Sequence, residues 1–519
     1  MGSVATVTPL HVHEEAFARA RSHARGVESM LCSDEMMRKE HSELEALLDG
    51  AGKEWARLML EENFRLRALV EQRKEVVGAD GKARESARDS ERHLETVLGR
   101  VSVPRLAYQS PGSSDLHPMD ASLNLPREMF SHGLRRLIAR EAARSSFDEV
   151  VDTVRELTGA SIAKRQVEEL TVRAAQDFDA FYEQRAQNRD PSKDLLVIST
   201  DGKGIVMRHE DLRDGTKRAA EKSNQKLQTR LTPGEKSNRK RMAQVATVYS
   251  IAPFTRTPGD IVHTLRDASE LDTRRPRPTD KRVWASVEKS CRAVIREAFD
   301  EALRRDPEQK RRWVVLVDGE PKQLRAVKAE ARRAGVQVTI LADLIHVIEY
   351  IWSAARALFG GSNSKAEKWV ADRLLALLCG HSGGEVVKTI RWWKARTKLD
   401  DAANAAIDKT CAYLSDRIRT RLLKYNDALA DGLPIATGVI EGACRYVVKD
   451  RMDRTGARWS LTGAEAVLRL RALRASKDFD AYWQFHLEQD RLRNHASRYQ
   501  QAEIPDPMPA PKSRLKRVK

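Results

Sequence analysis

The sequence predicts a mixed α/β chain, in which a strand-containing core is preceded by a mainly helical region and interrupted by further helices. Three observations lead to this prediction. Apolar residues recur at helical spacing through much of residues 14–76 and 127–189. After Pro191 the pattern changes to short β-branched runs such as WVVLV (313–317). Residues 359–430 then return to a polar, helical pattern, so we expect them to form an all-helical insertion in the core.

The composition indicates a polyanionic partner. The 519 residues carry 92 Lys and Arg against 75 Asp and Glu, which gives a net charge of +17. Nucleic acid is the first choice of partner for a large basic chain, and an anionic membrane is the weaker alternative because we find no long basic amphipathic helix. No apolar run approaches the roughly 18 residues that span a bilayer, and the first residues lack a signal-peptide pattern. We therefore expect a cytoplasmic protein with no membrane partner.

The cysteines are too scattered to form a disulfide framework or a zinc finger. The chain has five of them, and no two stand at Cys-x-x-Cys spacing. We expect reduced structural thiols.

The first part of the chain is predicted to be helical up to about residue 76. Residues 78–92 are polar and charged, and we expect them to separate these helices from a small β element at 95–112.

A helix-turn-helix pattern follows. One helix is expected over about 127–143, a second from near Ser146, and a third from near Ser161 after a break at Thr158–Ala160. Lys164 and Arg165 stand near the start of the third helix, where a DNA-reading helix carries its contacts. The alternative is an ordinary helical hairpin, but the positive net charge of the chain favours a DNA-binding function.

The first candidate catalytic acid is Asp201. Residues 195–208 read as two strands folded back on a tight turn at Gly202 and Gly204, with Asp201 at the end of the first strand. A carboxylate at the rim of a sheet is held by a rigid scaffold and is accessible to a metal ion. The alternative is that Asp201 only begins a hairpin turn. A third strand is expected at 244–254, and a long amphipathic helix at 282–305.

The second candidate catalytic acid is Asp318, which has the same sequence context as Asp201. It follows the apolar run at 313–317 and precedes Gly319. A helix at 321–334 and a strand at 336–343 complete a β-α-β unit, which predicts parallel strands.

Three further polar residues stand at helix starts. Asp343 and His346 are three residues apart on one helical face, and Glu441 opens a later helix. Each has an ordinary alternative, namely a helix cap, a buried histidine and a surface acid.

Two aspartates at neighbouring strand ends and a glutamate on a later helix can hold two hard divalent cations through oxygen ligands alone. Two such ions can clamp the attacking and leaving oxygens of a phosphodiester. The β-β-β-α-β-α-β order with acids at these places is the layout of a ribonuclease H-like fold.

Four ordered motifs carry a resemblance to a known family. STDGKGIVM around Asp201, VLVDGE around Asp318, the Asp343/His346 pair and GVIEGACRYVVKDR around Glu441 resemble the DDE transposases of bacterial insertion sequences, in the Mutator-like group and its ISKra-type branch. The resemblance runs from about residue 95 to 500. It implies metal-dependent cleavage at terminal inverted repeats and transfer of the 3′-hydroxyl ends into target DNA.

The resemblance also implies roles for individual residues. Asp201, Asp318 and Glu441 would bind two Mg²⁺ or Mn²⁺ ions, His346 would assist catalysis and Asp343 would support it. The basic residues after Glu441 would hold the DNA backbone; these are Lys449, Arg451, Arg454 and Arg458. Partners would be double-stranded DNA and, during synapsis of two ends, at least one further copy of the chain. Some relatives carry a Cys-bearing element near residues 108–118, and this sequence has no Cys there.

These interpretations give a domain plan. The limits are residues 1–94 for a helical N-terminal region, 95–190 for a DNA-binding region, 191–358 and 431–500 for two parts of a catalytic core, 359–430 for the helical insertion, and 501–519 for a disordered basic tail. Two other functions stay open, namely a transposase-derived repressor without catalysis and a ribonuclease H-like nuclease without strand transfer.

Overall fold

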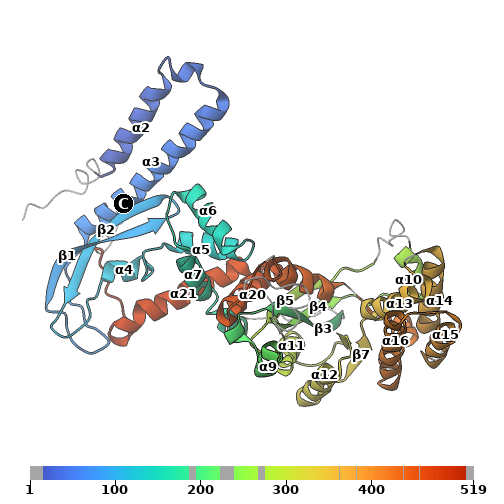
Figure 1. The fold of residues 1–519 in the computed structure, drawn as a ribbon. Coiled ribbons are helices and arrows are strands. Elements are labelled where there is room, and N and C mark those ends of the chain that lie inside the picture. Colours follow the sequence, from blue (N-terminus) through green and yellow to red (C-terminus); the bar gives the residue numbers. More distant parts are fainter. Residues whose placement is uncertain are drawn as a thin grey trace, which may run out of the picture. The chain divides into compact units, whose positions relative to one another are not determined.

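The computed structural model describes residues 16–185, 194–222, 239–266, 275–361, 363–380, 383–436, 438–454 and 456–509. The chain divides into two compact units (Figure 1). Unit 1 contains the chain up to Glu183 together with the residues from Asp480 onward, and unit 2 contains Gln184–Phe479. In the described ranges, no helix is long and apolar enough to cross a bilayer.

Unit 1 is mainly helical and holds one two-stranded sheet. Its longer elements are the helices α2 (Ala18–Leu31), α3 (His41–Val70), α5 (His132–Ala142), α6 (Phe147–Thr158), α7 (Lys164–Ala174) and α21 (Phe479–Asn494), and the strands β1 (Ser86–Thr96) and β2 (Gly99–Gln109). Two short helices, α4 (Pro118–Ser122) and α8 (Phe178–Gln184), complete it. The helices α2 and α3 confirm the helical pattern predicted for residues 14–76.

The predicted separation at residues 78–92 is wrong, because β1 begins inside it. This strand pairs antiparallel with β2 along its whole length, from Ser86 opposite Gln109 to Thr96 opposite Gly99. Its sequence, SARDSERHLET, is so polar that it lacks the apolar alternation of a typical strand. The pairing with β2 supplies the stabilisation, and the predicted limit at residue 94 falls within β1.

The three predicted helices of the helix-turn-helix region are present. Ser146 caps α6 by accepting a hydrogen bond from the Glu149 amide at 3.2 Å, and Gly159 ends it with a φ of 70°. The third helix begins at Lys164, three residues later than predicted. Buried apolar residues from all three helices form one core; among them are Leu134, Ile138, Val150, Val154, Val167 and Leu170.

The last long helix belongs to unit 1, which corrects the prediction that residues 431–500 all belong to the catalytic core. In α21, Tyr482 is fully buried and donates a hydrogen bond to the carbonyl oxygen of Ala174 at 2.6 Å. Further along, the amide of Gln500 donates to the carbonyl oxygen of Val77. Most of the predicted disordered tail, residues 510–519, lies outside the described residues.

Unit 2 is built on a five-stranded mixed sheet in the order β5-β4-β3-β6-β7. The strands are β3 (Leu195–Val206), β4 (Lys240–Ile251), β5 (Thr279–Ser286), β6 (Trp313–Val317) and β7 (Val338–Ala342). β3, β4 and β5 are joined antiparallel, whereas β6 and β7 run parallel to β3. The mixed α/β class is thus confirmed.

The predicted tight hairpin at residues 195–208 is wrong. The chain continues as one strand through Gly202 and Gly204, which pair with Gln244 and Met242 of β4. Neither glycine has a positive φ, so neither turns the chain. An Asp-Gly pair favours a turn locally, but the pairing with β4 holds the backbone extended. Asp201 therefore lies within a strand.

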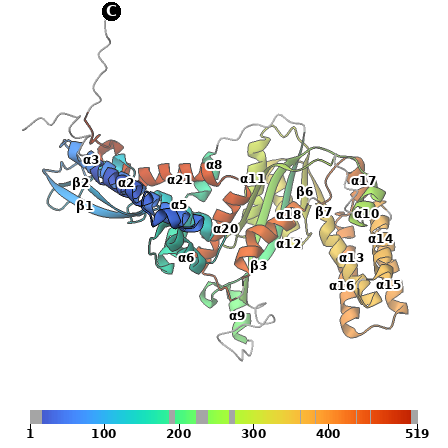
Figure 2. The ribbon, with the colours of Figure 1, turned by 90° about the horizontal axis from the view of Figure 1, so that it is seen from above.

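The helices of unit 2 cover the sheet and extend from it. They are α9 (Asp214–Lys222), α10 (Pro258–Arg266), α11 (Cys291–Arg305), α12 (Pro321–Ala334), α13 (Leu344–Phe359), α14 (Ser364–Leu378), α15 (Gly383–Arg396), α16 (Asp401–Arg419), α17 (Tyr425–Ala430), α18 (Val439–Ala443), α19 (Asp450–Met452) and α20 (Leu461–Ala475). The helix predicted at 282–305 is shorter than expected, because its first residues form β5. The helical insertion predicted at 359–430 is confirmed as helical: α14, α15 and α16 pack with α13 in one bundle (Figure 2).

Candidate active site

Three of the predicted acids lie at one edge of the sheet of unit 2. Thr200 of β3 is in register with Val317 of β6, and Val317 is in register with Ala342 of β7. The next residue on each of these three strands is an aspartate; these are Asp201, Asp318 and Asp343. Neighbouring strands are separated by about 4.8 Å, so the three residues form a row along the same edge.

Asp343 and Glu441 form a buried pair of like charges. Asp343 is 2% exposed, and one of its oxygens, Oδ1, accepts a hydrogen bond from the amide of Ile345 at 2.9 Å. The other oxygen of Asp343 and both carboxylate oxygens of Glu441 are buried and receive no hydrogen bond from a donor in the described ranges. Two facing carboxyl groups satisfy each other only when one of them holds a proton.

The pKa values reflect this arrangement. Burial, and after it the charge of Glu441, raise the pKa of Asp343 to about 7. The pKa of Glu441 is also raised, first by burial and then by the charge of Asp201. Asp201, Asp343 and Glu441 are therefore close enough to act on one another.

Asp201 has two polar contacts. Its Oδ1 accepts a hydrogen bond from the amide of Gly202 at 2.6 Å, and its Oδ2 accepts one from the thiol of Cys444 at 3.2 Å. Burial and the adjacent Asp201 raise the pKa of the Cys444 thiol well above its usual value, so the thiol stays protonated and remains a donor. Cys444 begins a π-helical turn, Cys444–Lys449, directly after α18.

Asp318 is held by the helical insertion. The buried Arg417 of α16 donates from Nε and Nη2 to the carbonyl oxygen of Asp318, at 3.3 and 3.0 Å. The hydroxyl of Tyr413 lies 3.4 Å from the same oxygen, and the ring of Tyr413 stacks on Tyr350 of α13 at 3.7 Å. Gly319 has a φ of 88°, and a Cβ there would lie 2.7 Å from Nε of Arg417. The carboxylate itself is 37% exposed and 3.7 Å from Nη2 of Arg417.

His346 lies one turn into α13, beside the acids. Its charge, when present, lowers the pKa of both Asp343 and Glu441, so it lies within electrostatic range of the two. Its Nδ1 is 3.8 Å from Glu349, and its side chain is 19% exposed. The structure thus brings Asp201, Asp343 and His346 within electrostatic range of Glu441, and the strand register places Asp318 at the same edge of the sheet.

The residues present fit a hard divalent cation by donor type. Three buried carboxylate oxygens without a hydrogen-bond donor offer the oxygen ligands that Mg²⁺ and Mn²⁺ prefer. Within the described part of the chain, no group of three or more His, Cys, Asp or Glu side chains is already arranged around one point as a metal site.

The predicted DNA-binding residues have different surroundings. Lys164 and Arg165 of α7 are exposed and have ion pairs with Asp148 at 2.7 Å and with Glu169 at 3.1 Å. Surface pairs of this kind cost little to open, so both side chains remain accessible to a phosphate.

The basic residues after Glu441 differ among themselves. Lys449, Arg454 and Arg458 are exposed. Arg451 is 3% exposed, and its guanidinium lies over the ring of Trp459 at 4.7 Å. Burial does not fit the predicted direct DNA contact for Arg451; its position indicates that it fixes the loop that carries Arg454 and Arg458.

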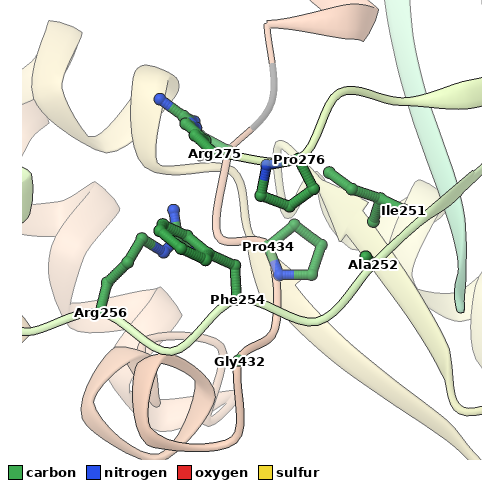
Figure 3. Close-up of a pocket in the computed structure, with 9 residues that line it drawn as sticks. Ile251, Ala252, Phe254, Arg256, Arg275, Pro276, Gly432 and Pro434 are labelled. Carbon is green, nitrogen blue, oxygen red and sulfur yellow. The ribbon is translucent and has the colours of Figure 1, made fainter. Parts of the chain in front are cut away.

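Several residues of the site were not predicted. Cys444, Arg417 and Tyr413 contact the acids across more than ninety positions of sequence, and no local spacing relates them. A small pocket elsewhere in unit 2, between Phe254, Arg256 and Pro434, has a volume of about 20 Å³ (Figure 3). It has room for about one water and lies at the end of β4 that pairs with the start of β3, away from Asp201.

Comparison with known proteins gives no relative. The chain matches no protein-family model and no curated protein sequence.

Proposed function

We propose that this protein is a DNA transposase with a ribonuclease H-like catalytic core. The observation that carries the proposal is the buried pair of Asp343 and Glu441 beside Asp201, at the edge where Asp318 also lies. Burying like charges without a cation is unfavourable, so such a group indicates a site for a cationic ligand. The strand order β5-β4-β3-β6-β7, with the first three strands antiparallel, supports the ribonuclease H-like assignment.

In this proposal Asp201, Asp318 and Glu441 hold two Mg²⁺ or Mn²⁺ ions through their carboxylate oxygens. When bound, the ions polarise the phosphodiester and lower the pKa of an attacking water. Asp343 and His346 position Glu441 and adjust its charge, because both lie within electrostatic range of it. Arg417 and Tyr413 fix the main chain at Asp318.

The proposed reaction has two steps. Water attacks a phosphodiester at each end of the mobile element; a P–O bond forms, the bond to the 3′ oxygen breaks, and a 3′-hydroxyl is released. That hydroxyl then attacks a phosphodiester of the target DNA, so that one P–O bond replaces another and no external energy source is needed. Two ends held together require at least a dimer on DNA. The work would take place on cytoplasmic, nucleoid-associated DNA.

The test is strand transfer of a labelled inverted-repeat end in Mg²⁺ or Mn²⁺. Wild type is compared with Asp201→Asn, Asp318→Asn and Glu441→Gln, which preserve shape and remove charge. Each variant should lose joined product by about 10³-fold or more while DNA binding persists. Asp431→Asn, which changes an exposed acid paired with Arg312, is the matched control and should stay active.

The other outcomes separate the alternatives. Cleavage without joining in wild type would indicate a nuclease. DNA binding without chemistry would indicate a repressor, and activity that survives loss of one acid would remove that residue from the site.

A further inference from the structure

Unit 1 contains a basic hollow that none of the predicted site residues line. It has a volume of about 840 Å³ and lies among β2, α4 and the end of α21. Five arginines line it: Arg92, Arg105, Arg127, Arg493 and Arg498. Only two acids, Asp115 and Asp120, line it with them. The hollow therefore attracts anions.

The two acids neutralise the arginines only in part, and Arg493 is also paired with Asp177 and Asp490, which do not line the hollow. Asp120 is shared, because it lies 2.8 Å from Nε of Arg105 and 3.6 Å from Nη1 of Arg92. Asp115 is 37% exposed and accepts a hydrogen bond from the Gln109 amide at 2.7 Å. Arg127 is exposed and has no ion pair with any of the residues described.

Main-chain oxygens fix two of the guanidinium groups. Arg92 donates to the carbonyl oxygen of Glu128 at 2.6 Å, and Arg498 donates to the carbonyl oxygen of Asp115 at 2.6 Å. A carbonyl oxygen orients a guanidinium without cancelling its charge. Both groups are thus preorganised and keep further N–H donors for a phosphate.

The hollow is also tied to the helix-turn-helix region. Glu128, whose carbonyl holds Arg92, forms ion pairs through its side chain with Arg173 of α7 and Arg135 of α5. The amide of Ser131, which caps α5, donates to the carbonyl of Glu95 in β1 at 2.8 Å. These contacts hold the hollow and the three helices in one body.

We infer that this hollow binds the phosphodiester backbone of duplex DNA, and that it is a second contact surface next to the helix-turn-helix. Arginine forks suit phosphate oxygens, and a concave site that carries excess charge concentrates an extended anion. The argument for duplex DNA over a free nucleotide is that Glu128 links the hollow to the end of α7 at Arg173, and the start of the same helix carries the exposed Lys164 and Arg165. The inference does not depend on catalysis by unit 2.

The experiment measures binding of the full chain to a labelled duplex of unrelated sequence, in EDTA, by fluorescence anisotropy over a range of salt concentrations. Each phosphate contact contributes about 0.9 to the slope of log K against log salt. The double variant Arg127→Gln/Arg498→Gln should lower the slope by about 1.8 relative to wild type, if each residue neutralises one phosphate. Both residues are exposed, and circular dichroism checks that the variant is folded.

Controls make the outcome decisive. Arg127→Lys/Arg498→Lys keeps both charges and should restore the slope, and Arg25→Gln, an exposed arginine of α2, should not change it. The assay is run in EDTA, so a failure of the metal-dependent catalytic proposal would leave this result intact.

Two results would overturn the inference. One is an unchanged slope in the Gln double variant. The other is saturable binding of AMP or inorganic phosphate that the Gln variant loses while its affinity for the duplex stays that of wild type, which would assign the hollow to a small phosphate ligand.

Discussion

Both units bury charged side chains, but they differ in whether neighbouring cations compensate the buried acids. In unit 1, Arg135 is 2% exposed and lies 2.8 Å from Asp490, while His486 and Arg493 contact Asp177 at 2.7 and 3.0 Å. Burial alone would raise the pKa of Asp177 and of Asp490, but the neighbouring cations outweigh it and lower both.

The acids of unit 2 have the reverse surroundings. Burial again acts to raise the pKa. The charge of Glu441 raises the pKa of Asp343 further, whereas His346 and Asp201 act on the pKa of Glu441 in opposite directions. Among the described residues, no Lys or Arg forms an ion pair with Asp201, Asp343 or Glu441. We call the first the complete cluster, because its own cations compensate its acids. We call the second the incomplete cluster, because no Lys or Arg of the described residues pairs with these acids.

The largest effect should come from breaking the complete cluster. Arg135→Ala removes the closest cation from buried Asp490 and leaves it only the longer pair with Arg493 at 3.5 Å, so the free energy of unfolding of unit 1 should fall by about 3–5 kcal/mol. Hydrogen exchange of α5 measures it without assuming that the two units unfold together. Arg136→Ala is the control on the same helix; it removes an exposed pair with Asp480 and should cost less than about 1 kcal/mol. Equal losses would mean that the network is not the stabilising feature.

A smaller effect of opposite sign is expected in the incomplete cluster. The pKa of Asp343 is about 7 in the folded chain, above its ordinary 3.8, so its protonated form favours folding and this stabilisation is lost as pH rises from about 4 to 7. Asp343→Asn should therefore stabilise metal-free unit 2 at pH 8 by roughly 2 kcal/mol, about half of what so large a shift gives an isolated group.

The measurement is urea unfolding at several pH values. Near pH 4 the variant and wild type should agree, and added Mg²⁺ should stabilise wild type more than the variant at pH 8. A difference that does not depend on pH would contradict the assignment of a like-charged pair.

The contact between Gly319 and Arg417 should give an effect of about 1 kcal/mol. Gly319→Ala adds a Cβ at 2.7 Å from Nε of Arg417, in addition to the strain of a φ of 88°. Gly335→Ala has a φ of 63° and open space around it, so it carries the backbone strain alone. The difference between the two variants in thermal unfolding isolates the contact, and a difference near zero would show that Arg417 moves away freely.

The smallest effect concerns the thiol beside Asp201. Cys444→Ala removes a weak donor and should cost less than about 1 kcal/mol, with Cys444→Ser closer to wild type because it keeps a donor. A complete loss of DNA cleavage in both variants would assign the thiol a larger role than hydrogen bonding.

The parts of the fold that were predicted are those with local signals. The segment from β6 to β7 was predicted to within two residues, because a fully buried run, Pro321 at the first helical turn and Gly335 after the last one mark its elements. The strands β1 and β5 were missed, since their stabilisation comes from partners distant in sequence. The place of α21 in unit 1 also depends on contacts such as Arg135 with Asp490, 355 residues apart.

In the candidate site, too, the residues with a local sequence signal were predicted and those that depend on distant contacts were not. Asp201, Asp318 and Asp343 each follow an apolar run in the sequence. An acid in this position is predicted to lie at the end of a strand, and this rule identified all three residues even though Asp201 lies within a longer strand. Arg417 and Tyr413 carry no such mark, and Arg451 looks like any surface arginine in sequence although it is buried. The roles of these three residues depend on their packing in the folded chain, which the local sequence does not indicate.

The return of the chain to unit 1 after Phe479 has a consequence for biosynthesis. A ribosome releases the residues of unit 2 before it releases α21, and α21 supplies Tyr482, His486 and Asp490 to the interior of unit 1. The N-terminal half-unit must therefore wait, with Arg135 lacking its acid, until nearly the whole polypeptide has emerged. A chain that stops early at about residue 478 would keep every acid of the candidate site and still lack a finished N-terminal unit.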